Sequence, residues 1–313
     1  MITDAFTYLK QTQRFLREQK QDFENPDDLM VYINRARREV AGRTQCIRRL
    51  TPISAPIVSA TVVTGGAGYV APVATITTPD WASGALPNPN GLQATALVQM
   101  VGGVVTAVDL QNGGDGYFQP QITITDANGP GKGATATLTT APINTLNEGQ
   151  EVYNFSDIYL GNWPGVDTIL AVHSVSIIYS QYRYSIPMIA FSTYQAQVRQ
   201  FSTATYQYVP SFGSQFGQGN GGSLFFYPPA SQSYQVEYDC FCLPTDMQLD
   251  NSIPEPIPQP WTDAVPYMAA ALGFMEIQNL NSARFYMEEF DRRTLGYSSY
   301  ARPGRAINPY GRP

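Results

Sequence analysis

The chain reads Leu224-Phe-Phe-Tyr227, then Pro228-Pro-Ala-Ser-Gln-Ser233, then Tyr234-Gln-Val-Glu-Tyr-Asp-Cys-Phe-Cys242, and this stretch decides its fold. Side chains of a strand alternate between its two faces, so the tyrosine, valine and cysteine residues from Tyr234 to Cys242 share one face. Two apolar runs separated by a Pro-rich turn predict a β-hairpin. One face of that hairpin is expected to be buried.

A Pro-rich connector follows the predicted hairpin. Prolines recur at positions 244, 254, 256, 258 and 260, where they hold the chain extended and donate no backbone hydrogen bond. The connector leads to a run from Trp261 to Leu295 with apolar residues at helical spacing. We expect one helix over this run, with Pro266 in its first turn, where proline is tolerated.

Two helices are predicted near the amino terminus. Thr3 is expected to cap a first helix that ends by Phe23. A second helix begins at Asn25-Pro26-Asp27-Asp28, because proline suits the first helical position and carboxylates suit the positive end of the helix dipole. Its buried face is expected to comprise Leu29, Ile33, Ala36, Val40, Ile47 and Leu50. Its outer face is expected to carry Arg35, Arg37, Arg38, Arg43, Arg48 and Arg49. This arginine face could be a stripe that contacts phosphates or a solvated face that contacts a partner. We favour the solvated, partner-contacting face, because arginine-rich helical faces commonly pair with carboxylates in oligomers and the net charge of -6 does not favour binding to DNA.

These segments resemble one protein family. The hairpin, the Pro-rich connector and the run Ala264-Val-Pro-Tyr-Met-Ala-Ala-Ala-Leu272 are similar to the head-to-tail adaptor (connector) proteins of short-tailed bacteriophages. Together with the amino-terminal helices, the resemblance covers roughly two thirds of the chain. The first two helices are too short to bury their apolar stripes alone, so the helix from Trp261 is their expected partner.

The chain between Pro52 and Pro142 is rich in Gly, Thr, Val and Ala and contains an internal repeat. Gly65-Gly-Ala-Gly-Tyr69 matches Gly113-Gly-Asp-Gly-Tyr117 at an offset of 48 residues (113 minus 65). Each copy predicts a strand, a glycine turn with positive φ and a second strand that starts at a proline. We expect one β module with pseudo-twofold symmetry, similar to small Gly-Tyr-Pro β domains of phage virion proteins. A P-loop is excluded, because Asp126 and Gly133 stand where it needs glycine and a hydroxyl residue.

The third section of the chain is predicted to be an antiparallel β domain. Strands are expected over residues 151–159, 168–179 and 182–189, and a short helix over residues 192–199. A long Gly-rich loop over residues 206–222 is expected to expose aromatic side chains. The candidates for contacts with other subunits or partners are therefore Arg35, Arg38, Tyr206, Tyr208, Phe212 and Phe216.

The predicted fold class is α+β. It combines a discontinuous helical bundle, built from both ends of the chain, with an antiparallel β domain and an inserted all-β repeat module. The first helical part covers residues 1–51, the inserted module 52–142 and the β domain 143–250. The connector and carboxy-terminal helix cover residues 251–296, and an extended tail covers residues 297–313.

The composition argues against several classes of function. The sequence contains one histidine, His173, which lies among apolar residues and is expected to be a core or interface residue. Three cysteines, Cys46, Cys240 and Cys242, have no accompanying ligand set and are expected to be reduced, buried thiols. We therefore expect no catalytic residue, no metal and no cofactor. No apolar run is long enough to predict a membrane span.

The resemblance implies a structural virion protein at the head-tail interface. Such adaptors form a twelvefold ring beneath the portal protein, extend the DNA channel and offer a docking surface to the tail nozzle and tail fibre proteins. Viral DNA would pass through the lumen without sequence-specific binding. Two alternatives stay open: a carbohydrate- or receptor-binding tail protein, and a wall-degrading glycosidase that uses two of Glu148, Glu151 and Asp157.

The tail is the expected anchor on the portal protein, because in related adaptors this part of the chain inserts between portal subunits. It contains no acidic residue and ends in a run of Arg, Pro and Tyr. Arginine supplies forked hydrogen-bond donors, and tyrosine supplies aromatic contacts. The predicted interface residues are Tyr300, Arg302, Arg305, Tyr310 and Arg312.

Overall fold

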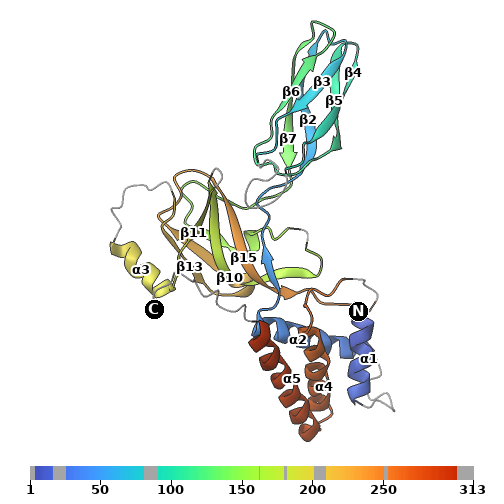
Figure 1. Cartoon of the computed structure of the whole chain (residues 1–313), viewed down its shortest axis with the longest axis vertical. Helices are drawn as coiled ribbons and strands as arrows, with labels where there is room; N and C mark the ends of the chain where they lie inside the picture. Colours follow the sequence, from blue (N-terminus) through green and yellow to red (C-terminus); the bar gives the residue numbers. More distant parts are fainter. Residues whose placement is uncertain are drawn as a thin grey trace.

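The computed structural model describes residues 4–16, 26–80, 91–161, 163–179, 182–200, 209–249 and 253–301. Three parts follow one another along the longest axis of the molecule (Figure 1). Helices form one end, two β-sheets form the middle, and a narrow group of six strands forms the other end. Because helices and largely antiparallel sheets occur in separate parts, the predicted α+β class is confirmed.

The amino-terminal helices are α1 (Ala5–Leu16) and α2 (Pro26–Thr44). The Asp4 carboxylate accepts a hydrogen bond from the Thr7 backbone nitrogen at 2.7 Å and so caps α1. The predicted cap Thr3 and the predicted helix end at Phe23 lie outside the described residues. The predicted start of α2 is confirmed. Its predicted extension to Leu50 is wrong, because Gln45 turns the chain with a φ of 51° and Arg48–Leu50 form strand β1.

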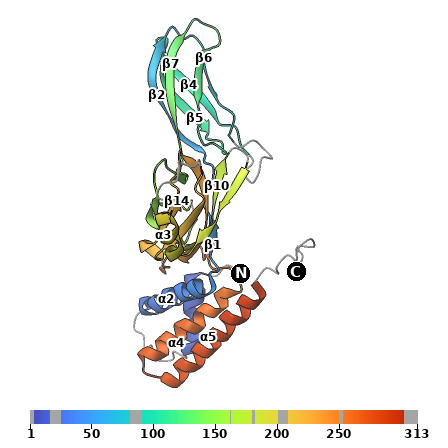
Figure 2. The ribbon, with the colours of Figure 1, turned by 90° about the vertical axis from the view of Figure 1, so that its left-hand side faces the viewer.

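The carboxy-terminal part contains two helices where one was predicted. A 3-10 turn, η3 (Trp261–Ala264), leads into α4 (Val265–Glu276), which carries Pro266 in its first turn as expected. Gln278 then adopts a φ of 59°, and the chain reverses into α5 (Leu280–Ala301). Figure 2 shows α4 and α5 side by side. The predicted extended tail from residue 297 is also wrong as far as Ala301, which is helical.

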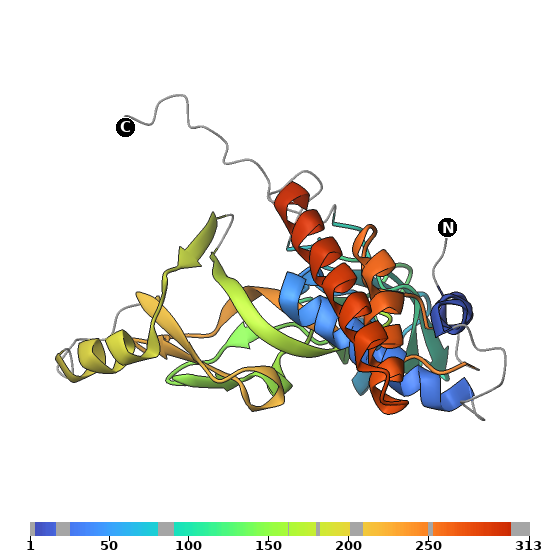
Figure 3. The same cartoon turned by 90° about the horizontal axis from the view of Figure 1, so that it is seen from below.

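Helix α4 is the centre of the helical part. Its residues from Val265 to Phe274 are buried with one exception, Tyr267, so it is apolar around almost its whole circumference. It contacts α1, α2 and α5, and it lies between α1 and α5 in two views (Figures 1 and 3). Side chains from both ends of the chain therefore share one core.

The middle part holds two sheets. The first has the order β1-β15-β10-β11, with β8 pairing β15, and the second has the order β12-β13-β14-β9. Pairing is antiparallel except between β12 and β13, which are parallel. Besides β1, the strands of the first sheet are β8 (Thr145–Leu146), β10 (Val166–Tyr179), β11 (Tyr182–Ile186) and β15 (Tyr234–Pro244). Those of the second are β9 (Val152–Asn154), β12 (Met188–Ile189), β13 (Phe212–Phe216) and β14 (Ser223–Tyr227).

The predicted β-hairpin is wrong, because β14 and β15 belong to different sheets. The residues between them carry the chain from one sheet to the other, and the apolar faces of both strands enter the same core. The predicted buried face of β15 is confirmed: the residues on that face are at most 3% exposed, namely Tyr234, Val236, Tyr238, Cys240 and Cys242. Its other face is also mostly covered, and it buries Glu237 and Asp239.

Other predictions for the middle part were partly correct. The expected helix at residues 192–199 is α3 (Phe191–Gln200). Residues 151–159 form only the short strand β9 and the 3-10 turn η1 (Phe155–Asp157), and residues 182–189 divide at Pro187 into two strands. The expected loop at residues 206–222 contains strand β13 and a 3-10 turn, η2 (Gly219–Gly221).

The six strands at the far end, here called the distal β unit, are antiparallel pairs. Strand β2 pairs with β7, β3 with β6, and β4 with β5. Each of the two sequence-related stretches connects a long strand to a short one, β2 to β3 and β5 to β6. The strands are β2 (Ile57–Ala67), β3 (Pro72–Ile76), β4 (Thr95–Val101), β5 (Val104–Asn112), β6 (Ile122–Asp126) and β7 (Lys132–Thr140).

A tyrosine in each glycine turn of the distal β unit forms a hydrogen bond to the backbone of the other repeat, and we call these two bonds the reciprocal tyrosine locks. The Tyr69 hydroxyl accepts a hydrogen bond from the Ala134 nitrogen at 3.0 Å, and the Tyr117 hydroxyl accepts one from the Ala94 nitrogen at 2.8 Å. Both tyrosines are buried. The φ of Gly66 and that of Gly114 are both 62°, as expected for these turns. A Cβ atom at Gly66 would lie only 2.5 Å from the Ala134 nitrogen, so glycine is required there.

Candidate functional site

The arginines predicted on the outer face of α2 fall into two classes. Arg35, Arg38 and Arg43 are exposed, as expected. Arg37 is fully buried, so its predicted place on the outer face is wrong. Arg48 and Arg49 lie in β1, beyond the end of the helix. Position 37 is three residues before Val40 and four after Ile33, which places it in the apolar stripe of the helix.

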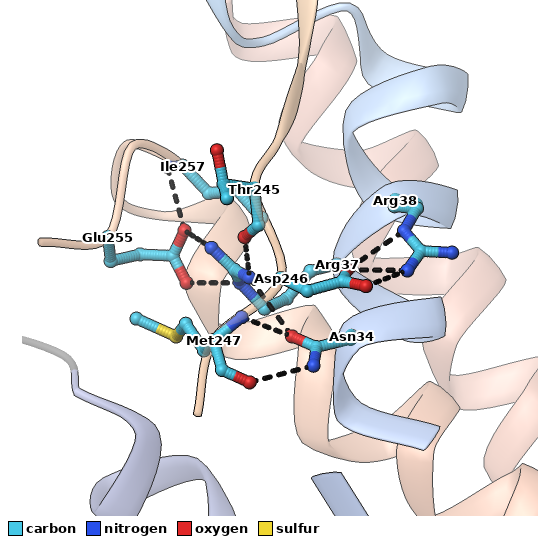
Figure 4. Close-up of polar contacts among 8 residues, drawn as sticks. All are labelled: Asn34, Arg37, Arg38, Thr245, Asp246, Met247, Glu255 and Ile257. Carbon is cyan, nitrogen blue, oxygen red and sulfur yellow. Dashed lines mark hydrogen bonds and ion pairs between the residues drawn. The ribbon is translucent and has the colours of Figure 1, made fainter. Parts of the chain in front are cut away.

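Arg37 binds the Pro-rich connector to α2 (Figure 4). Its Nε lies 2.9 Å from Oε2 of Glu255, and its Nη2 lies 3.1 Å from Oε1, so the pair is bidentate. Its Nη1 donates to the Thr245 carbonyl at 2.7 Å and to Asn34 at 3.2 Å. The side chains of Arg37 and Glu255 are 0% and 4% exposed. Each buried charge is therefore compensated by the other.

Two further contacts complete this junction. Asn34 accepts a hydrogen bond from the Met247 nitrogen and donates one to the Met247 carbonyl, both at 2.9 Å. Arg38 forms an ion pair with Asp246 at the surface, and the hydrogen bond to Asp246 raises the pKa of Arg38. Burial, and then the Glu255 charge, raise the pKa of Tyr8 on α1. The junction thus joins α2 to the connector, and its carboxylate is committed to an ion pair rather than available for catalysis.

The predicted contact residues are only partly within the described chain. Tyr206, Tyr208, Arg302, Arg305, Tyr310 and Arg312 lie outside the described residues, and Tyr300 is part of α5. Phe212 and Phe216 lie on β13, where aromatic residues of α3 and β14 meet. Phe216 is 56% exposed, and its ring centroid lies 4.7 Å from that of Phe191. Phe212 packs against Tyr194 at 5.7 Å and is half-buried.

Large exposed apolar side chains on the helical part were not predicted. Phe285 and Leu295 on α5 are 58% and 71% exposed, and Phe6 on α1 is 56% exposed. Phe285 and Leu295 share an outer face of α5 with the exposed residues Asn281, Glu288 and Arg292. Phenylalanine and leucine on an otherwise polar helix face are the sequence signal for such a surface.

The possible catalytic groups do not converge. His173 is half-exposed rather than in the core, with its Nδ1 3.5 Å from Asp239, which also binds Arg48. Burial raises the pKa of the Cys242 thiol to about 12 and that of Cys46 to about 11, so both stay protonated at neutral pH. Glu151 accepts a hydrogen bond from the Tyr194 hydroxyl at 2.6 Å. Among the described residues, no three His, Cys, Asp or Glu side chains form a group that could hold a metal ion.

Helices α1 to α5, as far as they are described, include none that is long and apolar enough to cross a membrane. No protein-family model matches the chain. A comparison with curated proteins also finds no match. Inferences about function therefore depend on the residues and geometry described above.

Proposed function

We propose that the protein is a head-to-tail adaptor of a short-tailed bacteriophage, which assembles into a ring beneath the portal protein and makes or breaks no covalent bond. In this proposal the helices from both ends of the chain form one discontinuous bundle, and residues 52–142 form an inserted repeat module. The backbone at the two ends of the distal β unit supports an insertion. The Ala141 nitrogen donates to the Pro56 carbonyl at 3.0 Å, so the chain enters and leaves this unit at one place.

The observation that carries the proposal is the pair of apolar surfaces on the outer helices. Phe6 on α1 and Phe285 with Leu295 on α5 are exposed, and α4 lies between these two helices (Figure 3). Exposed apolar side chains on two helices separated by α4 suit a heterologous contact, in which Phe6 of one copy meets Phe285 and Leu295 of the next copy. Such contacts close into rings when the rotation between copies permits.

Mass measurement tests this proposal. Native mass spectrometry of the whole chain, alone and mixed with a portal protein, should show a ring or a monomer that forms a ring on the portal. The double variant Phe285→Asp, Leu295→Asp should prevent the ring, because charges in an apolar contact lose their hydration. The matched control is Val63→Asp, which places the same residue at a 62% exposed valine of β2 and should leave the ring intact. A wild-type chain that stays monomeric in both conditions would contradict the proposal.

The other partners follow from the same proposal. The tail, with Arg302, Arg305, Tyr310 and Arg312, would bind the portal protein, and Tyr300 lies at the end of α5 where that tail begins. The middle sheets and the distal β unit would face the tail nozzle and tail fibre proteins. An acidic net charge of -6 suits a channel through which viral DNA passes without being held. The location proposed is the head-tail interface of the virion.

A further inference from the structure

A cleft opens beside the point where the chain leaves the distal β unit. It has a volume of 340 Å³, which lies within the range of small-ligand sites, about 300–1,000 Å³. One wall is the loop that precedes β9, with Asn147 and Gln150. The other is formed by Asn154, the last residue of β9, and Asp157 in the turn that follows it. Side chains of Tyr153 on β9 and Tyr238 on β15 also line it.

Hydrogen bonds hold both walls of this cleft in place. Asn144, which is 7% exposed, donates from Nδ2 to the Tyr159 carbonyl at 2.7 Å and accepts from the Tyr159 nitrogen at 2.8 Å. The Tyr153 hydroxyl accepts a hydrogen bond from the Asn147 nitrogen at 2.7 Å. The cleft is therefore formed before any ligand arrives, which lowers the entropic cost of binding.

Tyr238 supplies an uncommitted polar group in the cleft. Its side chain is 1% exposed, and its hydroxyl makes no hydrogen bond with any residue that the structure describes. Burial, and then the neighbouring Tyr153, raise the pKa of Tyr238, so its phenol stays neutral. A neutral phenol both donates and accepts hydrogen bonds. A hydroxyl at the wall of a cleft that no protein group engages can bond to a ligand or to a water molecule.

The charge of the lining selects the ligand class. Asp157 is the one carboxylate among the lining residues, and no lysine, arginine or histidine lines the cleft. Asn154 donates from Nδ2 to Asp157 at 3.2 Å, which places an amide and a carboxylate side by side on an exposed wall. Such a pair, with a further amide and the Tyr238 hydroxyl nearby, offers hydrogen-bond donors and acceptors to adjacent hydroxyl groups of a ligand.

We propose that this cleft binds a neutral saccharide. The inference does not rest on ring assembly, since all the lining residues belong to one subunit. A phosphorylated or acidic ligand would meet Asp157 without a compensating cation. Hydrolysis of a glycosidic bond uses a pair of carboxylates, and the lining supplies one. The site is thus a binding site, and Glu148 and Glu151 are not part of it.

Binding of the whole chain to a printed array of neutral and sialylated oligosaccharides tests the proposal. Saturation-transfer NMR then measures the dissociation constant of the strongest neutral member. We expect binding to neutral glycans only. Asp157→Asn should weaken it about tenfold or more, because a hydrogen bond to a charged group is lost. Tyr238→Phe should weaken it several-fold and leave the fold intact, since its hydroxyl has no partner among the described residues.

The matched control is Asp167→Asn. Asp157 accepts a hydrogen bond from the adjacent Ser156 hydroxyl at 3.1 Å, and Asp167 accepts one from the adjacent Thr168 hydroxyl at 2.8 Å, but Asp167 lies outside the cleft. Asp167→Asn should therefore leave the dissociation constant unchanged. The proposal is overturned by an array without neutral binders, by preferred binding to sialylated glycans, or by equal affinity of the wild type, Asp157→Asn and Tyr238→Phe.

Discussion

Replacing Arg37 should open the junction between α2 and the Pro-rich connector. In Arg37→Met the Glu255 carboxylate, whose side chain is 4% exposed, loses both guanidinium hydrogen bonds. It keeps the hydrogen bond from the Ile257 nitrogen at 3.1 Å. Removal of one partner from a buried ion pair costs about 3–5 kcal/mol, because the remaining charge is left without compensation.

Arg38 provides a control on the next residue of the same helix. It pairs with Asp246, but the two side chains are 49% and 52% exposed. Exposed pairs contribute about 0–1 kcal/mol, since water screens them. Arg38→Met should therefore change the stability of the junction by no more than that. In the double variant Arg37→Met, Glu255→Leu most of the lost stability should return, because no unpaired charge stays buried.

Hydrogen exchange measured by mass spectrometry resolves these effects locally. Peptides from residues 26–44 and 253–276 should exchange roughly a hundredfold to a few thousandfold faster in Arg37→Met, at about 1.4 kcal/mol for each factor of ten. Peptides from the distal β unit serve as an internal reference and should not change. Equal, small changes in the exchange rates of Arg37→Met and Arg38→Met would refute the inference that the buried ion pair stabilises the junction more than the exposed one.

Four further predictions concern other parts of the chain. Gly66→Ala should unfold the distal β unit. Gly102→Ala should cost only the strain of its φ of 60°, because its Cβ would meet nothing within 4 Å. Proteolysis should therefore cleave the distal β unit faster in Gly66→Ala than in Gly102→Ala. Replacement of residues 57–140 by a short Gly-Ser linker should leave the helical circular dichroism of the remainder intact, and its loss would contradict an insertion. Deletion of Pro303–Pro313 should leave a folded chain that no longer co-sediments with the portal protein. Burial raises the pKa of the Glu237 carboxyl above its ordinary 4.5. The contribution of Glu237 to the free energy of unfolding is therefore present below pH 4.5 and is lost as the pH rises. In urea unfolding, the free energy of unfolding of Glu237→Gln should decline less with rising pH than that of the wild type.

Local sequence signals predicted some elements well. The start of α2 followed from Asn25-Pro26-Asp27-Asp28 because capping depends only on neighbouring residues. The buried face of β15 followed from alternation along one strand. The partner of that strand did not, because alternation indicates which face is buried and not which strand lies beside it. Thus β14 and β15, close in sequence, were assigned to one hairpin although they belong to different sheets.

Long-range pairing explains the failures at the candidate sites. The place of Arg37 in an apolar stripe signalled burial, but its partner Glu255 lies 218 residues away, and no local pattern connects the two. The cleft beside the distal β unit likewise combines residues 142–159 with Tyr238. The break between α4 and α5 occurs at Gln278, without glycine or proline. Its sequence signal was the change from an almost wholly apolar helix to one with a polar face.

The reciprocal tyrosine locks also determine the order of events during synthesis. Tyr69 leaves the ribosome well before Ala134, its hydrogen-bond partner, which follows 65 residues later. At roughly 5–20 residues per second, the first glycine turn waits about 3–13 s for the strand that closes it. During that interval β2 also lacks β7, its only paired strand among the described residues. Nascent chains in which residue 134 has not yet left the ribosome should therefore expose an unpaired β2 edge to chaperones, whereas chains in which residue 140 has left it should not.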